Sequence, residues 1–157
     1  MTTTSVPKRT PFFQRTPIRN TILVLSIAML CLRAYSLFDF IQVTGGIFFD
    51  HFTSYWIYLL QCCICIGFIL RGKIGLGLAF TCNIALLSLY FLPYNLTISQ
   101  LLIPTHFRVL LVGAIICSPL GQRIFIDPPL PRKQMRKMAL FIPLGLTLGL
   151  IPHFFFS

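Results

Sequence analysis

Residues 54–92 read SYWIYLLQCCICIGFILRGKIGLGLAFTCNIALLSLYFL, two apolar runs joined by the short connection Arg71-Gly72-Lys73. Each run is long enough to cross the hydrocarbon core of a bilayer, which is about 30 Å thick, as an α-helix. A connection this short requires the second helix to turn back beside the first. The stretch therefore predicts a transmembrane helical hairpin.

Three further apolar segments flank the two spans of this hairpin (54–70 and 74–92) and lie at residues 20–43, 100–118 and 138–156. The chain of 157 residues is 56% hydrophobic and 10% charged. Soluble domains of this size are about 25% charged, because they must cover their surface with polar groups. We therefore expect an all-α, polytopic membrane helix bundle with five transmembrane helices, four forming a core and the fifth C-terminal.

The chain divides into three parts on this interpretation. Residues 1–19, basic and rich in threonine and proline, are expected to form a disordered cytoplasmic tail; an organelle presequence is the alternative, and the prolines weigh against its amphipathic helix. Residues 20–130 form the four-helix membrane domain. Residues 131–157 form a basic loop and the fifth helix.

The positive charge of the chain, +10 in total, follows the predicted topology. Apart from Arg33 and Arg108, every lysine and arginine precedes the first span or lies in the second or fourth connection. These regions share one side of the membrane, so the positive-inside rule predicts a cytoplasmic N-terminus and an external C-terminus. We expect a bacterial inner membrane, or an organellar inner membrane as the alternative. Anionic headgroups account for the charge without nucleic acid as a partner.

Ionisable residues inside a membrane are costly and are therefore candidate functional sites. Helical rise places Arg33 and Arg108 at similar depth, in the outer third of the membrane. We predict that they pair with Asp39 or Asp50 around an anionic headgroup, a quinone carbonyl or a substrate carboxylate. The alternative is that the arginines extend to lipid phosphates or only join two helices. The predicted ligand- or lipid-binding cluster comprises Arg33, Asp39, Asp50, His51, His106 and Arg108.

Histidines and cysteines in the chain lack the spacing of a metal or redox site. His51, His106 and His153 lie on different segments, so we expect no metal or haem. Cys62 and Cys65 form a C-x-x-C pattern in the middle of an apolar span, where a thiolate is disfavoured. We interpret them as small apolar packing residues. No cofactor is predicted, apart from the quinone or lipid considered above.

Four other residues inside the spans indicate contacts between helices. Gln61 and Asn83 are expected to form hydrogen bonds between helices. Gly145 and Gly149 make a GxxxG step, which allows a second helix to approach closely. We expect this step to pack against a helix of a partner subunit.

Three short motifs resemble the horizontally transferred transmembrane (HTTM) domain, which also occurs in the membrane part of vitamin K-dependent gamma-carboxylases. The matching positions are Gly67-Phe68 with Arg71, Ser88-Leu89, and Pro119-Leu120-Gly121-Gln122-Arg123 with Asp127. Arg33 and Asp50 are similar to an arginine of the family's first helix and an acid of its next loop. The resemblance covers about residues 20–130 and implies a fold. The family's Asn-Arg-Asn-rich loop is replaced by Pro93-Tyr94-Asn95-Leu96, and carboxylase chemistry is not implied, because we expect no large luminal domain.

The sequence therefore supports two hypotheses about function. The first is a non-catalytic accessory or structural subunit of a larger membrane complex, with lipids and other transmembrane subunits as partners. The alternative is a small membrane enzyme, or a redox or maturation factor of the HTTM type, acting at the outer face. The sequence shows no nucleophile–base pair or phosphate-binding glycine loop, which favours the first.

Overall fold

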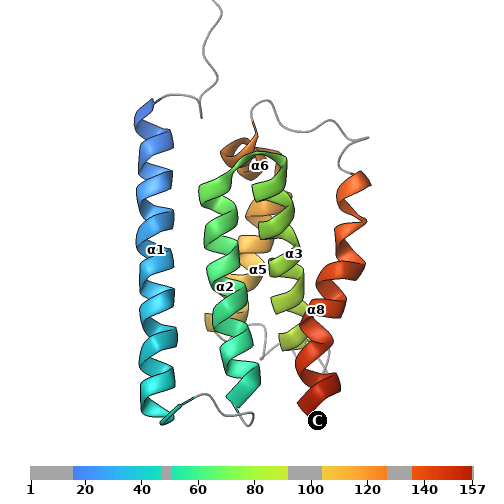
Figure 1. Ribbon diagram of the computed structural model, residues 1–157. Helices are drawn as coiled ribbons and strands as arrows, with labels where there is room; N and C mark the ends of the chain where they lie inside the picture. The colour runs from blue at the N-terminus through green and yellow to red at the C-terminus, as the bar shows by residue number, and fades with distance from the viewer. Residues whose placement is uncertain (1–15, 47–50, 92–103, 127–135, 157) are drawn as a thin grey trace, which may run out of the picture.

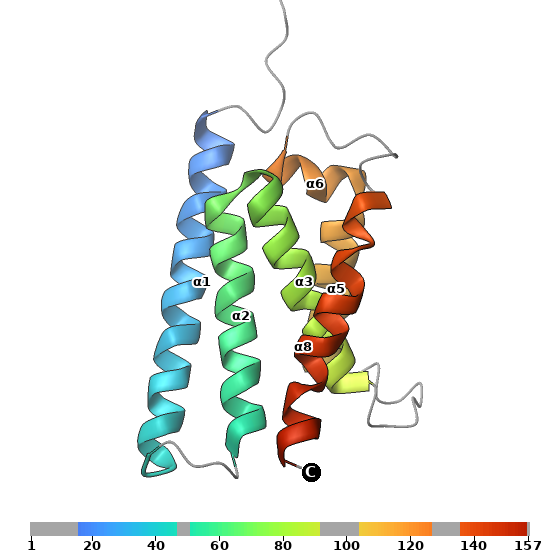
Figure 2. The same cartoon turned by 45° about the vertical axis from the view of Figure 1, so that its right-hand side comes forward.

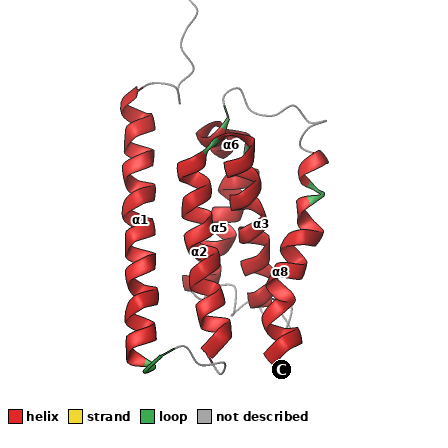
Figure 3. Cartoon of the chain, in the orientation of Figure 1, coloured by secondary structure: helices red, strands yellow, loops and turns green. Residues whose placement is uncertain are grey.

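The computed structural model describes residues 16–46, 51–91, 104–126 and 136–156, and the regular structure in these ranges is helical throughout (Figures 1 and 3). The helices are α1 (Thr16–Val43), α2 (Phe52–Leu70), α3 (Gly72–Phe91), α5 (Pro104–Cys117), α6 (Pro119–Phe125) and α8 (Phe141–Phe156). The predicted all-α bundle is confirmed. Most of the predicted N-terminal tail lies outside the described residues.

Four stretches of the described chain are long and apolar enough to cross a membrane: Pro17–Val43, Phe52–Leu70, Gly72–Phe91 and Arg136–Phe154. They identify a multi-pass membrane protein. The helix in the predicted fourth span is shorter: α5 has 14 residues, or about 21 Å at about 1.5 Å per residue. Residues 100–103, which begin the predicted span, lie outside the described residues.

The predicted hairpin is formed by α2 and α3, which are separated by one residue. Arg71 has a φ of 54° and Gly72 a φ of 64°, and this left-handed backbone reverses the chain. Glycine adopts such angles at little cost, whereas a residue with a Cβ rarely does. Beyond the turn the helices meet at Gly67 and Gly75, where a Cβ on Gly67 would lie 2.8 Å from the Gly75 carbonyl oxygen. The two glycines thus allow the helices to run in close contact.

The most buried of the four spans is α3, which packs against α2, α5 and α8 (Figures 1 and 2). Leu76, Ala85 and Leu86 are almost fully buried in it. The neighbours of α3 also contact each other, since Nε1 of Trp56 on α2 donates a hydrogen bond to the Leu148 carbonyl oxygen on α8 at 2.9 Å. In a bilayer such van der Waals packing and interhelical hydrogen bonds hold helices together.

The GxxxG step of α8 lies directly on α3. A Cβ on Gly145 would lie 2.7 Å from Cβ of Ile84, and a Cβ on Gly149 would overlap the Ser88 hydroxyl. Both glycines are buried. The close helix approach that they allow therefore occurs within the chain, and the expectation that Gly145 and Gly149 receive a helix of a partner subunit does not hold.

A sharp break separates α5 from α6, where the sequence predicts that the fourth span stops. Oγ of Ser118 accepts a hydrogen bond from the Gly121 amide at 2.9 Å and caps α6. Pro119 follows in the first turn, a position that requires no amide donor. A Cβ on Gly121 would overlap the Ile115 carbonyl, so only glycine fits between the two helices.

At the edge of the bundle lies α1, with α2 as its main neighbour (Figures 1 and 2). Hydrogen bonds attach both of its ends. Nη2 of Arg71 donates to the Arg19 carbonyl oxygen at 2.6 Å, and at the other end the Thr44 and Tyr55 hydroxyl oxygens lie 3.1 Å apart. The most hydrophobic stretch of α1 has no buried residue, so most of its surface faces lipid or another protein.

One end of the bundle carries the start of α1, the α2–α3 connection, α6 and the segment that leads into α8 (top of Figure 1). Six described basic residues belong to these segments: Arg19, Arg71, Lys73, Arg123, Arg136 and Lys137. The fold thus places at one end the six described charges among those on which the positive-inside argument depends. The orientation itself stays a prediction.

Candidate functional site

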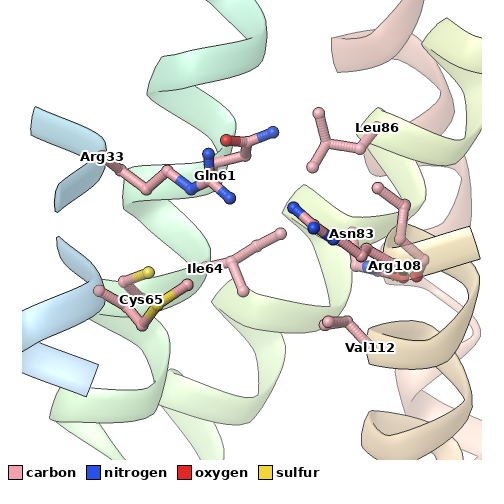
Figure 4. Close-up of a pocket in the computed structure, with 10 residues that line it drawn as sticks. Arg33, Gln61, Ile64, Cys65, Asn83, Leu86, Arg108 and Val112 are labelled. Atoms are coloured by element: carbon pink, nitrogen blue, oxygen red, sulfur yellow. Dashed lines mark hydrogen bonds between the residues drawn. The ribbon is translucent and has the colours of Figure 1, made fainter. Parts of the chain in front are cut away.

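A cavity of about 130 Å³ lies inside the bundle, between α1, α2, α3 and α5 (Figure 4). It is lined by Met29, Arg33, Gln61, Ile64, Cys65, Asn83, Leu86, Arg108, Val109 and Val112. Gln61 lies at the middle of α2, and Asn83 lies near the middle of α3. The cavity is therefore inside the membrane, away from both ends of these two spans.

Two arginines from helices at opposite sides of the cavity share it. Arg33 enters from α1 and Arg108 from α5, and Figure 4 shows both side chains extending toward the space between them. No carboxylate is among the described residues that line the cavity. Because a guanidinium group stays charged at all relevant pH values, the cavity concentrates positive charge that no described lining residue balances.

The two amide side chains beside the arginines, Asn83 and Gln61, differ in their hydrogen bonding. Nδ2 of Asn83 donates a hydrogen bond to the Val109 carbonyl oxygen on α5 at 3.2 Å, which confirms the predicted contact between helices. Oε1 of Gln61 is buried and accepts no hydrogen bond, so the contact predicted for this residue is not made by its oxygen. A buried acceptor without a donor is costly in protein and in lipid.

The remaining wall is apolar and incomplete. Ile64, Leu86 and Val112 line the cavity beside the polar groups. The helices that supply the arginines, α1 and α5, do not pack closely against each other. The cavity is therefore not closed by helix packing on the side between them, and an apolar chain can leave it there toward the lipid.

Asp39, one of the two aspartates predicted near the arginines, is not part of this cavity. Asp39 follows Arg33 by six residues, which places it about 240° around the helix and about 9 Å along it. It is exposed and does not line the cavity. Asp50 lies outside the described residues. The structure thus joins Arg33 to Arg108 and separates both from Asp39.

The predicted histidines contact aromatic rings elsewhere in the bundle. His51 lies edge-on to Phe40, with ring centroids 5.8 Å apart. His106 lies against Tyr90 and Phe91, with centroid distances of 4.8 and 5.3 Å. Neither histidine lines the cavity, so the five described residues of the predicted cluster separate into an arginine pair that lines the cavity and three residues, Asp39, His51 and His106, that do not.

The cysteines give the cavity a minor contribution. Cys65 lines it, whereas Cys63 packs against the buried cluster that includes Cys82 at the α2–α3 interface. All six cysteines are free thiols. Within the described ranges, no group of three or more histidine, cysteine or acidic side chains is placed to hold a metal ion.

Gln61 and Cys65 are residues of the cavity that the sequence-based cluster omitted. One signal was available for Gln61, because a lone amide in the middle of an apolar span requires a partner. Cys65 carried no such signal.

The arrangement suits recognition of an acceptor group more than a chemical step. Two guanidinium groups can donate several hydrogen bonds to a carboxylate, a phosphate or a carbonyl oxygen, and the apolar wall can receive the adjoining carbon chain. Comparisons of the chain with protein families, with curated proteins and with solved structures find no match.

Proposed function

We propose that this membrane protein is a non-catalytic subunit of a larger membrane complex and that it holds a membrane-soluble amphiphile. The polar head of the amphiphile lies between Arg33 and Arg108, and its tail leaves the cavity between α1 and α5. The observation that carries this proposal is the convergence of the two arginines in a cavity without a carboxylate among its described lining residues.

The free energy of burying these charges supports a bound ligand. An arginine at the centre of a membrane helix costs about 2.5 to 3.5 kcal/mol on translocon-insertion scales, and the cost is smaller for Arg108, which is exposed and lies in the second turn of α5. Two of them in one cavity add mutual repulsion to that cost. A headgroup with an anionic or strongly accepting oxygen offsets both terms, because each guanidinium then gains a charge-assisted hydrogen bond. A lipid headgroup and a quinone carbonyl both meet this requirement.

The exposed face of α1 is the proposed contact with a partner subunit. Several large apolar side chains are exposed along this helix, including Val24, Leu25 and Tyr35. The small-residue face of α8 is already covered by α3, so α1 offers the most uncovered surface. We place the basic end in the cytoplasm or an equivalent organellar compartment, as the charge distribution suggests.

A second candidate function is a small membrane enzyme or maturation factor of the HTTM type. It is favoured by the position of Arg33, which the resemblance equates with an arginine of the family and which lies in the cavity. The other motif residues have packing roles that any function would require. Gly67 allows the hairpin to close, Ser88 lies against α8, and Gly121 fits beneath α5.

Purification in a mild detergent followed by native mass spectrometry tests the proposal. We expect the chain with at least one partner subunit and with a bound mass of a few hundred daltons or more. Arg33→Gln and Arg108→Gln should each lose the bound mass, whereas Arg123→Gln, at an exposed position of α6, should keep it. A lone monomer that carries neither partner nor ligand would contradict the proposal. Retained binding with loss of a cellular activity in the arginine variants would favour the enzyme.

A further inference from the structure

We infer that a second lipid site lies at the basic end of the bundle, where Arg19, Arg71 and Lys73 hold the phosphate of an anionic phospholipid. The site joins the start of α1 to the α2–α3 connection (top of Figure 1). It is separate from the cavity of Arg33 and Arg108, so the inference does not depend on the proposed function. Four features lead to it: a groove, its depth in the membrane, a group of unbalanced cations and a strained arginine.

A groove of about 470 Å³ lies at the α2–α3 connection and is lined by Leu70, Arg71, Gly72, Lys73 and Ile74. Its walls combine two cations with two aliphatic side chains that are largely exposed, Leu70 at 59% and Ile74 at 80%. Cations beside exposed aliphatic side chains match the junction between a phospholipid headgroup and its acyl chains. An acidic protein segment would use the cations alone, so the composition of the groove favours a lipid.

The groove lies at the depth of lipid phosphates. The helix α2 has 19 residues and α3 has 20, which correspond to about 29 and 30 Å at about 1.5 Å per residue. Both lengths match a hydrocarbon core of about 30 Å, so the connection between the two helices reaches the headgroup region. Basic pockets between membrane helices at this level are suited to anionic headgroups.

The cations around the groove lack a counterion among the described residues. Nη2 of Arg71 donates to the Arg19 carbonyl oxygen at 2.6 Å, which brings the two arginines together. Burial, and after it the charge of Arg19, lower the pKa of Arg71 below its usual value. The one acid of the described ranges, Asp39, lies toward the other end of α1. A phosphate that accepts hydrogen bonds from these side chains offsets their repulsion.

The backbone of Arg71 gives an independent reason to assign a role to its side chain. Its φ of 54° and ψ of −167° form a combination found almost only in glycine. Glycine would form this turn with less strain, so the arginine side chain must supply interactions that offset the cost. Its bond to the Arg19 carbonyl is one of them, but it also places two like charges near each other. A bound anion turns that repulsion into attraction.

The test uses the full chain in dodecyl maltoside, titrated with dioleoyl phosphatidylglycerol or dioleoyl phosphatidylcholine, which differ only in their headgroups. Native mass spectrometry measures the dissociation constant of the first bound lipid. We expect phosphatidylglycerol to bind about tenfold more tightly, because the choline cation reduces the attraction to a group of three cations. Glycerophosphoglycerol, the same anionic headgroup without acyl chains, should bind more weakly than phosphatidylglycerol.

Matched variants distinguish a site from general attraction to the basic end. Arg19→Gln and Lys73→Gln should each weaken binding of phosphatidylglycerol about fivefold, as expected for one cation at a membrane surface. Arg136→Gln and Lys137→Gln make the same substitutions at the same end of the bundle. They precede α8, which lies across the bundle from α1 in both views (Figures 1 and 2). These two variants should keep the affinity of the original chain.

The strained residue is tested by Arg71→Gly. Glycine adopts a positive φ at little cost, so the hairpin should still form while the affinity for phosphatidylglycerol falls about fivefold or more. An unchanged affinity in this variant overturns the role given to Arg71. Should the variant fail to accumulate, Arg19→Gln and Lys73→Gln decide the inference.

Three further results would overturn the inference. Equal affinity for the two phospholipids would leave the groove to an acidic segment of a partner protein. An equal loss in all four glutamine variants would show attraction spread over the basic end, without a site. Glycerophosphoglycerol binding as tightly as phosphatidylglycerol would reject the assignment to a lipid. Because Arg33 and Arg108 are present in every variant, each of these results leaves the function proposed for the cavity intact.

Discussion

The α3–α8 interface and the walls formed by α1 and α5 belong to one bundle but use opposite kinds of side chain. Between α3 and α8, Gly145 and Gly149 bring two backbones into direct contact. Between α1 and α5, Arg33 and Arg108 extend into a space that neither helix closes. Close packing of the two backbones stabilises the α3–α8 interface. The walls formed by α1 and α5 instead carry two positive charges that side-chain packing does not neutralise. Substitutions that replace these residues with leucine should therefore change stability in opposite directions.

The largest effect is expected from Gly149→Leu. The new side chain would overlap the Ser88 hydroxyl and the Ala85 carbonyl, so α8 must move away from α3. We expect a loss of about 3 kcal/mol in the free energy of unfolding, the upper part of the usual range for overpacking. Unfolding by dodecyl sulfate in mixed micelles measures it. Thr147→Leu, two residues away and exposed, is the control, and an equal loss in both variants would show that contact with α3 is not the cause.

Arg33→Leu tests the other half of the comparison. In the ligand-free protein this change removes from the membrane a charge that no described cavity residue balances, and we expect a gain in stability of about 2 kcal/mol, somewhat below the insertion cost of an arginine. Thermal unfolding in dodecyl maltoside, a detergent without an anionic headgroup, measures the change, with Arg123→Leu as a surface control. A loss of stability would instead support the view that Arg33 joins α1 to its neighbours.

A smaller effect separates the two amides of the cavity. Asn83→Leu removes the hydrogen bond to the Val109 carbonyl and should cost about 1 kcal/mol, a typical value for polar contacts between membrane helices. Gln61→Leu removes an oxygen that has no partner and should cost nothing in the ligand-free state. Similar losses in both variants would show that Gln61 is satisfied in the membrane.

The smallest effect concerns the end of the bundle. Ser118→Ala removes the cap of α6 and should reduce stability by about 0.5 to 1 kcal/mol, at the low end for N-caps because α6 is short. Hydrogen exchange of the α6 amides should rise, while exchange in α3 stays unchanged. Ser36→Ala, whose exposed hydroxyl bonds only within α1, is the comparison, and equal exchange in α6 of both variants would argue against the cap.

Much of the fold was predictable because lipid imposes a simple rule: a segment that crosses it must be apolar and satisfy its own backbone. Hydropathy therefore located the long helices within a few residues, and Arg71-Gly72 located the hairpin. Which helices become neighbours depends on side-chain packing, which hydropathy does not describe. The position of α3 at the centre and of Gly149 against Ser88 could not be derived in this way.

The sequence predicted how deep in the membrane the residues of the candidate site lie, but not which face of its helix each residue occupies. Counting residues along the helices placed Arg33 and Arg108 at similar heights, and both line one cavity. The same count placed Asp39 nearby, although it lies on another face of α1. Helical phase alone would have separated Asp39 from Arg33. No comparable argument identifies Cys65 as a cavity residue, because its place depends on where α1 and α5 lie.

The two hydrogen-bonded ends of α1 have a mechanical consequence. One end is held by the bond from Arg71 to Arg19, and the other by the contact between Thr44 and Tyr55. A helix that is attached at both ends and pushed at its middle bends outward, because its ends cannot shift. A ligand wider than the open side between α1 and α5 would therefore enter only when α1 bends at the level of Arg33, and the stiffness of that single helix would set how fast it enters and leaves.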